Sequence, residues 1–256
     1  MTRDFFILLA AFFFIGLQTT HAADTRKSGF DVMRAATQEL QKDDSQNPAM
    51  LWVKDGEALW QRSEGRAAKS CASCHGDARS SMRGVAARYP AFSSALKRVI
   101  NLQQQIDTCR STKQKADPLP AEHQTLLSLE SYVALQSRGL KLQPPNDDGL
   151  TLARTRGEAL FQQRIGQIAL SCKDCHVDNA GNALAGNVIP EAHPTGYPIY
   201  RLEWQGVGSL QRRLRNCMTG VRAEPYAFGS DELIALEVYL VSRAKGMKVE
   251  SPAVRP

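Results

Sequence analysis

Four of the six cysteines in this chain lie in two copies of the motif Cys-x-x-Cys-His. The motif residues are Cys71, Cys74 and His75 in the first copy and Cys172, Cys175 and His176 in the second. Two thiols one helical turn apart can add to the two vinyl groups of a haem, and the adjacent histidine then reaches the iron as its proximal ligand. A redox-active cysteine pair and half of a zinc site are the alternatives for a single copy. Because the motif occurs twice, we predict two covalently attached c-type haems.

The other two cysteines, Cys109 and Cys217, occupy equivalent places downstream of the two motifs. Each follows a basic stretch with helical character, where a cytochrome c fold places the distal haem ligand. We therefore predict that His75 and Cys109 bind the first iron, and that His176 and Cys217 bind the second. One alternative is that both are buried free thiols. The other is a Cys109–Cys217 disulfide, since exported chains rarely keep free thiols. Other side chains that could supply the sixth ligand are Met218, Met247, His123 and His193.

Arginines crowd the second of these cysteines in the stretch RRLRNCMTGVRAEPY. Arg213 precedes Cys217 by one helical turn, so their side chains share a face if the stretch is helical. A cation there stabilises the thiolate, and its guanidinium can bind an oxyanion such as a sulfonate by paired hydrogen bonds. The first unit has Gln105 at the matching place, so we predict that Cys109 is a ligand only, whereas Cys217 is a ligand within a substrate site. We interpret Arg212 and Arg215 as part of a solvated face. Arg222 is a further candidate for contact with the substrate.

Both motifs belong to an internal repeat. The stretches GEALWQRSEGRAAKSCASCH and GEALFQQRIGQIALSCKDCH align without a gap, and a Leu-Glu-x-Tyr pattern follows in each half. This self-similarity indicates two tandem units, and the stretch LQPPNDDG between them is typical of a linker. The predicted organisation is a signal peptide at 1–22, an N-terminal extension at 23–48, a cytochrome c-like domain at 49–142, a linker at 143–150 and a second cytochrome c-like domain with the active site at 151–250.

Helical periodicity dominates both units, whereas alternating strand patterns are scarce. The segments with helical character are 96–110, 121–139, 153–170, 210–217 and 230–246. Ser230 is placed to cap the last of these. Residues 187–204 are rich in proline and aromatic side chains and are predicted to form a loop over a large group. The predicted fold class is therefore mostly α, with two tandem cytochrome c-like domains, each with one covalent haem and long loops.

Charge and the N-terminus indicate the compartment and the class of partner. The formal net charge of +6 fits an acidic partner or an anionic substrate, and no Lys/Arg tract with interleaved aromatics indicates nucleic acid. Arg3, the apolar run from Phe5 to Leu17 and the small residues up to Ala22 form the pattern of a cleaved secretory signal. The apolar run is too short for a membrane anchor. We predict an exported, periplasmic protein that has neither a membrane anchor nor a nucleic-acid partner.

The paired motifs, the later cysteine in each half and the stretch RLRNCMTGVRAEPY resemble the SoxA subunits of the SoxAX cytochromes, over nearly the whole mature chain. Both motifs are complete, so the resemblance is to the dihaem form. In this family the active-site cysteine is both haem ligand and persulfide carrier in an Arg-x-x-x-Cys context, which matches Arg213 and Cys217. The resemblance implies an L-cysteine S-thiosulfotransferase that joins thiosulfate oxidatively to a cysteine of SoxY, the carrier subunit of SoxYZ. It also implies electron transfer to the haem of SoxX, its partner in a heterodimer.

Two other functions stay open from the residues. A dihaem thiosulfate dehydrogenase would couple two thiosulfates to tetrathionate and would not need a cysteine in both halves. A plain dihaem electron carrier would use Met or His as distal ligands and leave the Arg213–Cys217 pair idle. The first haem, at His75, is expected to be structural or vestigial. Residues 23–48 are expected either to clamp a partner or to pack on the second domain.

Overall fold

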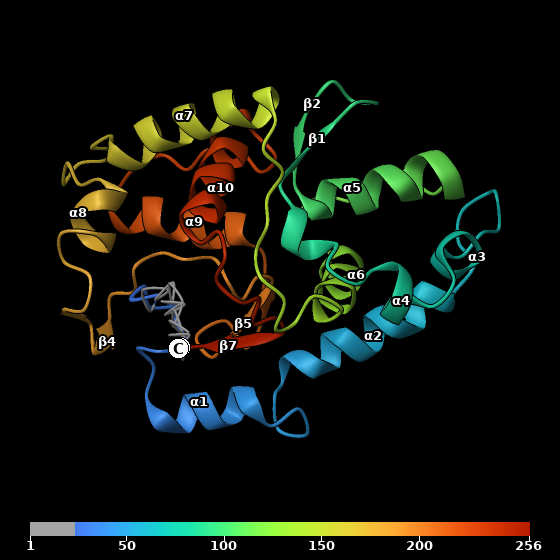
Figure 1. The fold of residues 1–256 in the computed structure, drawn as a ribbon, viewed down its shortest axis with the longest axis horizontal. Coiled ribbons are helices and arrows are strands. Elements are labelled where there is room, and N and C mark those ends of the chain that lie inside the picture. The colour runs from blue at the N-terminus through green and yellow to red at the C-terminus, as the bar shows by residue number, and fades with distance from the viewer. Residues whose placement is uncertain (1–23) are drawn as a thin grey trace, which may run out of the picture.

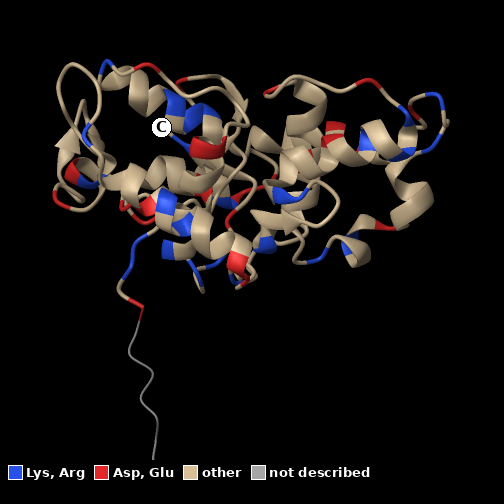
Figure 2. Ribbon diagram, turned by 90° about the horizontal axis from the view of Figure 1, so that it is seen from above, with Lys and Arg blue, Asp and Glu red and all other residues tan. Residues whose placement is uncertain are grey.

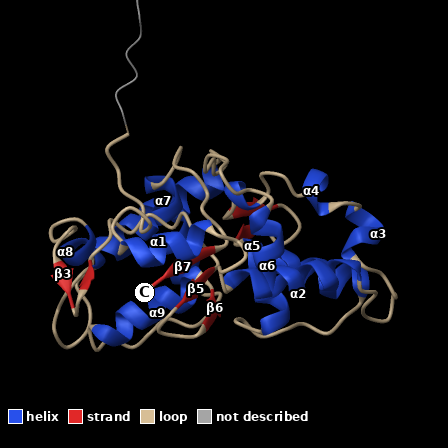
Figure 3. Ribbon diagram, turned by 90° about the horizontal axis from the view of Figure 1, so that it is seen from below, coloured by secondary structure: helices blue, strands red, loops and turns tan. Residues whose placement is uncertain are grey.

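The structure is a computed structural model that describes residues 24–256, so the predicted signal peptide at 1–22 lies outside the described residues. Helices make up most of the regular structure (Figure 1), and the strands are short and few beside them (Figure 3). The mostly α character predicted from the sequence is confirmed. In the described part of the chain, no helix is both long enough and apolar enough to cross a membrane.

The elements follow one another along residues 24–256 as a repeated helical pattern with small strand pairs between. The α-helices are α1 (Ala35–Lys42), α2 (Ala49–Gln61), α3 (Cys71–His75), α4 (Ala78–Ser81), α5 (Leu102–Cys109), α6 (Gln124–Leu135), α7 (Asp148–Gln162), α8 (Cys172–His176), α9 (Leu210–Gly220) and α10 (Asp231–Arg243). A 3-10 helix, η1, spans Ala86–Arg88, and a π-helix, η2, spans Arg110–Gln114. The strands are β1 (Ala91–Ser93), β2 (Arg98–Ile100), β3 (Ala183–Leu184), β4 (Asn187–Val188), β5 (Ile199–Arg201), β6 (Gly206–Gly208) and β7 (Ala253–Arg255).

Each unit is built on a closely packed pair of helices, α2 with α6 in the first unit and α7 with α10 in the second (Figure 1). The glycine of the repeated GEAL sequence lies where each pair meets. A Cβ atom on Gly56 would stand 2.1 Å from the carbonyl oxygen of Ser128, and one on Gly157 would stand 2.0 Å from that of Ala235. The backbones therefore touch directly, and only glycine leaves room for this approach.

The repeated aromatic residues meet inside these helix pairs. Trp60 and Tyr132 pack edge to face with 6.0 Å between ring centroids in the first unit. Phe161 and Tyr239 pack with 5.2 Å between centroids in the second. The aromatic that follows GEAL and the tyrosine of the Leu-Glu-x-Tyr pattern are therefore partners in both cores, which accounts for their joint recurrence in the sequence.

The helix predicted at 153–170 is wrong in its second half. α7 ends at Gln162, and the following residues form a loop that packs against the end of α9. Gly166 has a φ of +73°, and a Cβ atom on it would stand 2.0 Å from the carbonyl oxygen of Val221. The backbone becomes extended at Gln163, and this conformation and close contact of Gly166 are incompatible with a continued helix despite the helical spacing of the apolar side chains.

Three of the other predicted helices are found with shorter bounds, whereas the segment predicted at 210–217 extends to Gly220 as α9. Segment 96–110 begins as strand β2 of a hairpin, and α5 starts only after Asn101, which forms a capping box with Gln104. α10 starts after Ser230, whose side chain accepts a hydrogen bond from the backbone of Leu233, so the predicted cap is confirmed. Side-chain caps therefore set where these helices begin more sharply than the apolar pattern does.

A strand at the end of the chain lies beyond the predicted domain limit at residue 250. β7 pairs in parallel with β5, with Tyr200 opposite Val254, and β6 pairs antiparallel on the other side of β5. The stretch 187–204, predicted as a loop, therefore contains the central strand of a three-stranded sheet. Contacts between strands so distant in sequence leave little trace in local patterns.

The N-terminal extension packs on this sheet through α1. The Gln41 Oε1 atom accepts a hydrogen bond from the backbone N–H of Val254 at 3.0 Å, and Asn47 Nδ2 donates to the carbonyl oxygen of Pro252 at 3.0 Å. Of the two roles expected for residues 23–48, the structure therefore shows packing on the second unit.

Two carboxyl groups are enclosed where the units meet. Glu237 on α10 is 5% exposed, and its Oε1 atom accepts a hydrogen bond from Asn101 Nδ2 of the first unit at 3.2 Å. Burial raises the pKa of Glu237 to about 7, and the hydrogen bond from Asn101 offsets this only in part. Burial, and then the charge of Glu237, raise the pKa of Glu130 on α6 to about 8. Both repeat-equivalent glutamates therefore hold protons near neutral pH.

Replacing Glu237 by glutamine is expected to make the free energy of unfolding less dependent on pH. The carboxyl has a pKa of about 7 when folded and 4.5 as its ordinary value, so the folded state binds the proton more tightly. Its stabilising contribution is complete below the unfolded pKa and is lost as the pH rises through 7. The loss amounts to about 2 kcal/mol between pH 5 and pH 8. Denaturant unfolding of the natural and variant proteins at both pH values measures the difference.

The matched control is Glu158→Gln, which changes an exposed glutamate on α7. This control is expected to keep the pH dependence of the natural protein. An unchanged pH dependence in Glu237→Gln would contradict the assignment of Glu237 as a protonated buried group.

Candidate functional site

Both motif helices begin at a serine. In the first unit, the Ser70 side chain accepts a hydrogen bond from the backbone of Ser73 at 3.0 Å. In the second, the Ser171 side chain accepts from the backbone of Asp174 at 3.1 Å, and the Asp174 carboxylate accepts in return from the backbone of Ser171 at 2.9 Å. A helix as short as α3 or α8 depends on such a cap. The serine shared by both repeats therefore sets where each motif helix starts.

The first motif and Cys109 line one cavity of about 440 Å³. Cys71, Cys74 and His75 form one part of its wall, and Cys109 comes from the end of α5. Most of the remaining wall is apolar, contributed by Trp60, Met82, Val85, Leu102, Ile106, Leu129 and Val133. An apolar cavity with two thiols and a histidine on the wall and another sulfur on its lining fits a covalently attached haem.

Gln105 lies four residues before Cys109, at the place that Arg213 has before Cys217, and it is a neutral hydrogen-bond partner of Cys109. Its Nε2 atom donates to the Cys109 Sγ atom at 3.2 Å. The nearest buried cation, Arg110, pairs instead with Glu64. The first cysteine therefore has an amide N–H as its direct partner, whereas Arg88 and Lys113 lie elsewhere on the cavity wall.

At the second motif, the structure brings His176, Cys217 and Arg213 together. Cys217 is half-buried on α9, beside the His176 side chain. Burial alone raises the pKa of the Cys217 thiol. The neighbouring His176 and the positive charges of Arg213 and Arg201 outweigh this effect, so the pKa is lowered overall. The second cysteine therefore lies in an environment that favours the thiolate.

His176 is held in one tautomer by a backbone carbonyl. Its Nδ1 atom lies 2.7 Å from the carbonyl oxygen of Pro190. A carbonyl oxygen only accepts, so Nδ1 carries the proton and the lone pair is on Nε2. A histidine that donates one ring N–H to a carbonyl and keeps the other nitrogen free is the arrangement that proximal metal ligands use.

The motif cysteines do not resemble a redox-active dithiol. Burial raises the pKa of Cys71 and of Cys172 to about 11. Redox-active Cys-x-x-Cys pairs have a thiol of lowered pKa because the thiolate is the reactive form. The environment of these buried thiols therefore favours structural attachment over dithiol chemistry.

The other side chains considered as sixth ligands have other partners. Met218 is 5% exposed and packs in the core of the second unit, and Met247 packs with Ala244 in a separate cluster. His123 caps α6 by accepting from the backbone of Thr125 at 3.1 Å, and the His193 Nδ1 atom lies 2.8 Å from the carbonyl oxygen of Lys27. The alternative disulfide is not formed, because all six cysteines are free and the two later ones lie in different units.

The arginines on α9 are not a solvated face, so that interpretation is corrected. Lys and Arg are distributed over the whole molecule (Figure 2), and those near Cys217 have specific partners. Arg212 lies over the Trp204 ring at 4.3 Å from its centroid. Arg215 lies over the Phe228 ring at 4.6 Å and donates to the carbonyl oxygen of Tyr226. Both guanidinium groups are packed against aromatic rings.

Arg201 is a further cation at the site that sequence reasoning missed. It comes from β5, lies 5.2 Å from the centroid of Trp204, and has a side chain that is 12% exposed. Its buried Nε atom has no hydrogen-bond partner, and its charge helps to lower the pKa of Cys217. No sequence pattern connects Arg201 with Cys217; the Trp204 ring, which contacts both Arg201 and Arg212, links β5 to α9.

Arg222 lies beside a separate open concavity. Its backbone has a φ of +56°, and its carbonyl oxygen accepts from Gln167 at 3.3 Å. The concavity has a volume of about 440 Å³ and is also lined by Gly166 and Tyr226. In this arrangement Arg222 borders the loop after α7 and is not one of the charges that act on Cys217.

Comparisons with known proteins show the family of this chain. The family model described as "SoxA/TsdA, cytochrome c domain" matches residues 55–142 and 156–249. An L-cysteine S-thiosulfotransferase subunit SoxA from Pseudaminobacter salicylatoxidans is 40% identical over 92% of this chain and 82% of its own length. One from Rhodovulum sulfidophilum is 32% identical over 91% of this chain and 81% of its own. The crystal structure of SoxXA from P. pantotrophus is similar with a TM-score of 0.87 at 31% identity, covering 90% of this chain and 87% of that one.

The fold and the motif sites define a cytochrome c chain of the SoxA/TsdA family, with a cytochrome c domain that extends over two segments. Such a domain carries covalently bound haem c. Within that family the chain belongs with the SoxA subunits of L-cysteine S-thiosulfotransferases. The resemblance seen in the sequence is thereby confirmed, and so is the class of enzyme that it implied.

Proposed function

We propose that this chain joins thiosulfate to a cysteine of the carrier protein SoxY in periplasmic sulfur oxidation, as the partner of a SoxX cytochrome. In the overall reaction, the thiosulfate dianion and the carrier thiol form one S–S bond, with release of one proton and two electrons. The observation that carries this proposal is the joint placement of Cys217, His176 and Arg213. Similarity to SoxA subunits and to the SoxXA structure supports it.

We propose two c-type haems, one in each of two tandem cytochrome c-like units with limits near 49–142 and 151–250. The first would be attached at Cys71 and Cys74, with His75 and Cys109 as ligands, and the second at Cys172 and Cys175, with His176 and Cys217 as ligands. When bound, such a group accepts and passes on electrons one at a time. The apolar cavity at the first motif and the Pro190 contact of His176 support this assignment.

Cys217 is proposed to form the first S–S bond. Its thiolate and the outer sulfur of thiosulfate each contribute to this bond, and two electrons leave the pair. The Arg213 guanidinium would hold the sulfonate oxygens by paired hydrogen bonds. The carrier thiolate then attacks the outer sulfur, takes over the S-thiosulfonate group and restores the Cys217 thiolate.

Replacing Arg213 by alanine is expected to lower kcat/KM for thiosulfate about 100-fold, since a charge-assisted hydrogen-bonded contact to the sulfonate is lost. Both haems should stay attached, because Arg213 is not part of either motif. Steady-state assay with carrier and electron acceptor, combined with the mass of the purified chain, measures both quantities.

The matched control is Gln105→Ala, which alters the equivalent position of the first unit. It removes the hydrogen bond to Cys109 and should leave kcat/KM almost unchanged. Normal turnover by Arg213→Ala, or an equal loss in both variants, would remove Arg213 from the mechanism.

A peptide mass map before and after exposure to thiosulfate tests the proposed function directly. Haem on both motif peptides and added sulfur mass on the Cys217 peptide are expected in protein matured in a periplasm. An unmodified Cys217 peptide would argue for an electron carrier. Formation of tetrathionate without any carrier protein would argue for a thiosulfate dehydrogenase.

A further inference from the structure

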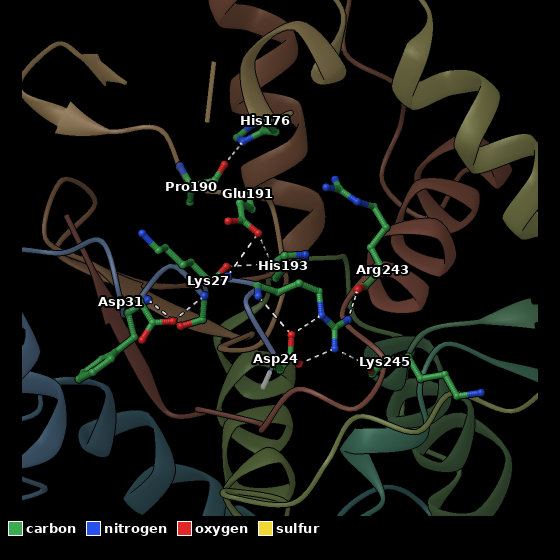
Figure 4. A network of polar contacts seen from close by, with 12 residues as sticks. Asp24, Lys27, Asp31, His176, Pro190, Glu191, His193, Arg243 and Lys245 are labelled. Atoms are coloured by element: carbon green, nitrogen blue, oxygen red, sulfur yellow. Dashed lines mark hydrogen bonds and ion pairs between the residues drawn. The ribbon is translucent and has the colours of Figure 1, made fainter. Parts of the chain in front are cut away.

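The start of the N-terminal extension is tied to the segment that follows the Pro190 carbonyl (Figure 4). Both backbone groups of Lys27 are engaged by side chains from this segment. The Lys27 N–H donates to the Glu191 carboxylate at 3.2 Å, and the Lys27 carbonyl oxygen lies 2.8 Å from His193 Nδ1. Two side chains that follow Pro190 therefore hold one residue of the extension from both sides.

His193 is the inner member of this contact. Its side chain is 3% exposed, and the Glu191 carboxylate lies 3.6 Å from its Nδ1 atom. Because the partner of Nδ1 is a carbonyl oxygen, Nδ1 is the protonated nitrogen and donates. Because this buried histidine donates a hydrogen bond to the Lys27 carbonyl, it fixes the position of segment 190–193 relative to residues 24–28.

The extension is anchored a second time at the end of α10. Arg26 donates to the carbonyl oxygens of Arg243 at 2.5 Å and of Lys245 at 3.0 Å. The Asp24 carboxylate accepts from the same guanidinium at 2.6 Å and holds it in this orientation. Residues 24–28 thus bridge the C-terminal end of α10 and the segment 190–193, as Figure 4 shows.

The two motif histidines differ in this respect. The His176 Nδ1 atom donates to Pro190, which directly precedes the residues tied to Lys27. In the structure of residues 24–256, the His75 ring has no corresponding hydrogen bond, and its nearest aromatic neighbour is Trp60 at 5.8 Å between ring centroids. The extension can therefore act on the second histidine without acting on the first.

We propose that residues 24–28 form a clamp that positions His176, by holding the segment 190–193 so that the Pro190 carbonyl stays on Nδ1. His193 and Glu191 are positioning residues in this proposal, since neither touches substrate or iron. The inference rests on the proposed attachment of a haem at the second motif. A hydrogen bond on the outer nitrogen of a ligating histidine sets its orientation and raises its basicity, which favours the oxidised metal. Loosening the clamp should therefore raise the reduction potential of the second haem alone.

The test uses His193→Ala and His193→Asn in the full haem-loaded protein. Alanine removes the donor, whereas the asparagine amide can place an N–H where Nδ1 was. A redox titration followed by electron paramagnetic resonance reports on the two ferric haems separately. We expect His193→Ala to change the one-electron reduction equilibrium of one haem at least tenfold, or about 59 mV, with the other haem unchanged. His193→Asn should restore most of the natural value.

His123→Ala is the matched control, because it removes the histidine that caps α6 in the first unit and has no contact with the clamp. It should leave the second haem unchanged. If His193→Ala does not fold, Glu191→Ala takes its place, since Glu191 is more exposed and is expected to give a smaller change of the same sign.

Two results would overturn the clamp. The first is a folded His193→Ala or Glu191→Ala protein with both potentials as in the natural protein. The second is an equal change of both haems, which would indicate general loosening. A mass map with haem on the first motif only would instead refute the proposed attachment at the second motif, so the two failures are distinguishable.

Discussion

Replacing Cys217 by methionine is expected to reduce the conjugation of thiosulfate to the carrier cysteine at least about a thousandfold. Methionine keeps a sulfur atom that can bind iron, but its thioether cannot form and release an S–S bond. The second haem should therefore stay attached while the chemistry is lost. Carrier-dependent turnover, with the haem content of the same sample, measures this separation.

The chain contains its own control for this prediction. Cys109 occupies the equivalent place in the first unit, where Gln105 stands in the position of Arg213. Cys109→Met should change the spectrum of the first haem and retain most of the activity. Equal losses in the two variants would mean that both cysteines serve only as haem ligands.

The contrast between the two cysteine sites explains why only one is expected to react. Cys217 has His176 and two guanidinium groups in its surroundings, that of Arg213 and that of Arg201, the latter also paired with Glu203. Cys109 has an amide as its direct partner, because Arg110 is paired with Glu64. The two cysteines occupy equivalent positions. Both are candidate haem ligands, but only Cys217 has surrounding charges that would also make it reactive.

Replacing Gly157 by alanine is expected to destabilise the protein by at least about 3 kcal/mol, or to prevent accumulation of folded protein. The new Cβ atom would stand 2.0 Å from the carbonyl oxygen of Ala235, so α7 and α10 would have to move apart. Such a movement would also separate Phe161 from Tyr239 in the core between them. Denaturant unfolding of the haem-loaded protein measures the change in the free energy of unfolding.

Gly56→Ala should have a similar effect on the first unit, because its Cβ atom would stand 2.1 Å from the carbonyl oxygen of Ser128. Gly220→Ala at the end of α9 is the control, since nothing lies within 4 Å of a Cβ atom there. Its stability should stay within about 1 kcal/mol of the natural protein or rise slightly, given the higher helix propensity of alanine. Equal stability of Gly157→Ala and Gly220→Ala would contradict the backbone contact seen between α7 and α10.

Features with a short sequence range could be predicted well. The two motifs and the Ser230 cap act over a few residues, so their spacing is visible in the chain itself. The same holds for Arg213 and Cys217, because one turn of α9 separates them. Where a local pattern was misleading, as in the predicted helix 153–170, a distant backbone contact at Gly166 prevailed over helical periodicity.

Other parts of the site depend on contacts between residues far apart in the chain. The position of Arg201 near Cys217, the carbonyl of Pro190 on His176 and the tie between Lys27 and His193 have no spacing signal. The sequence alone therefore determined the two-unit helical plan, the haem motifs and the cysteine with its neighbouring arginine. Folding in three dimensions determined which side chains surround them, because packing and hydrogen bonding act on distance in space and not on distance along the chain.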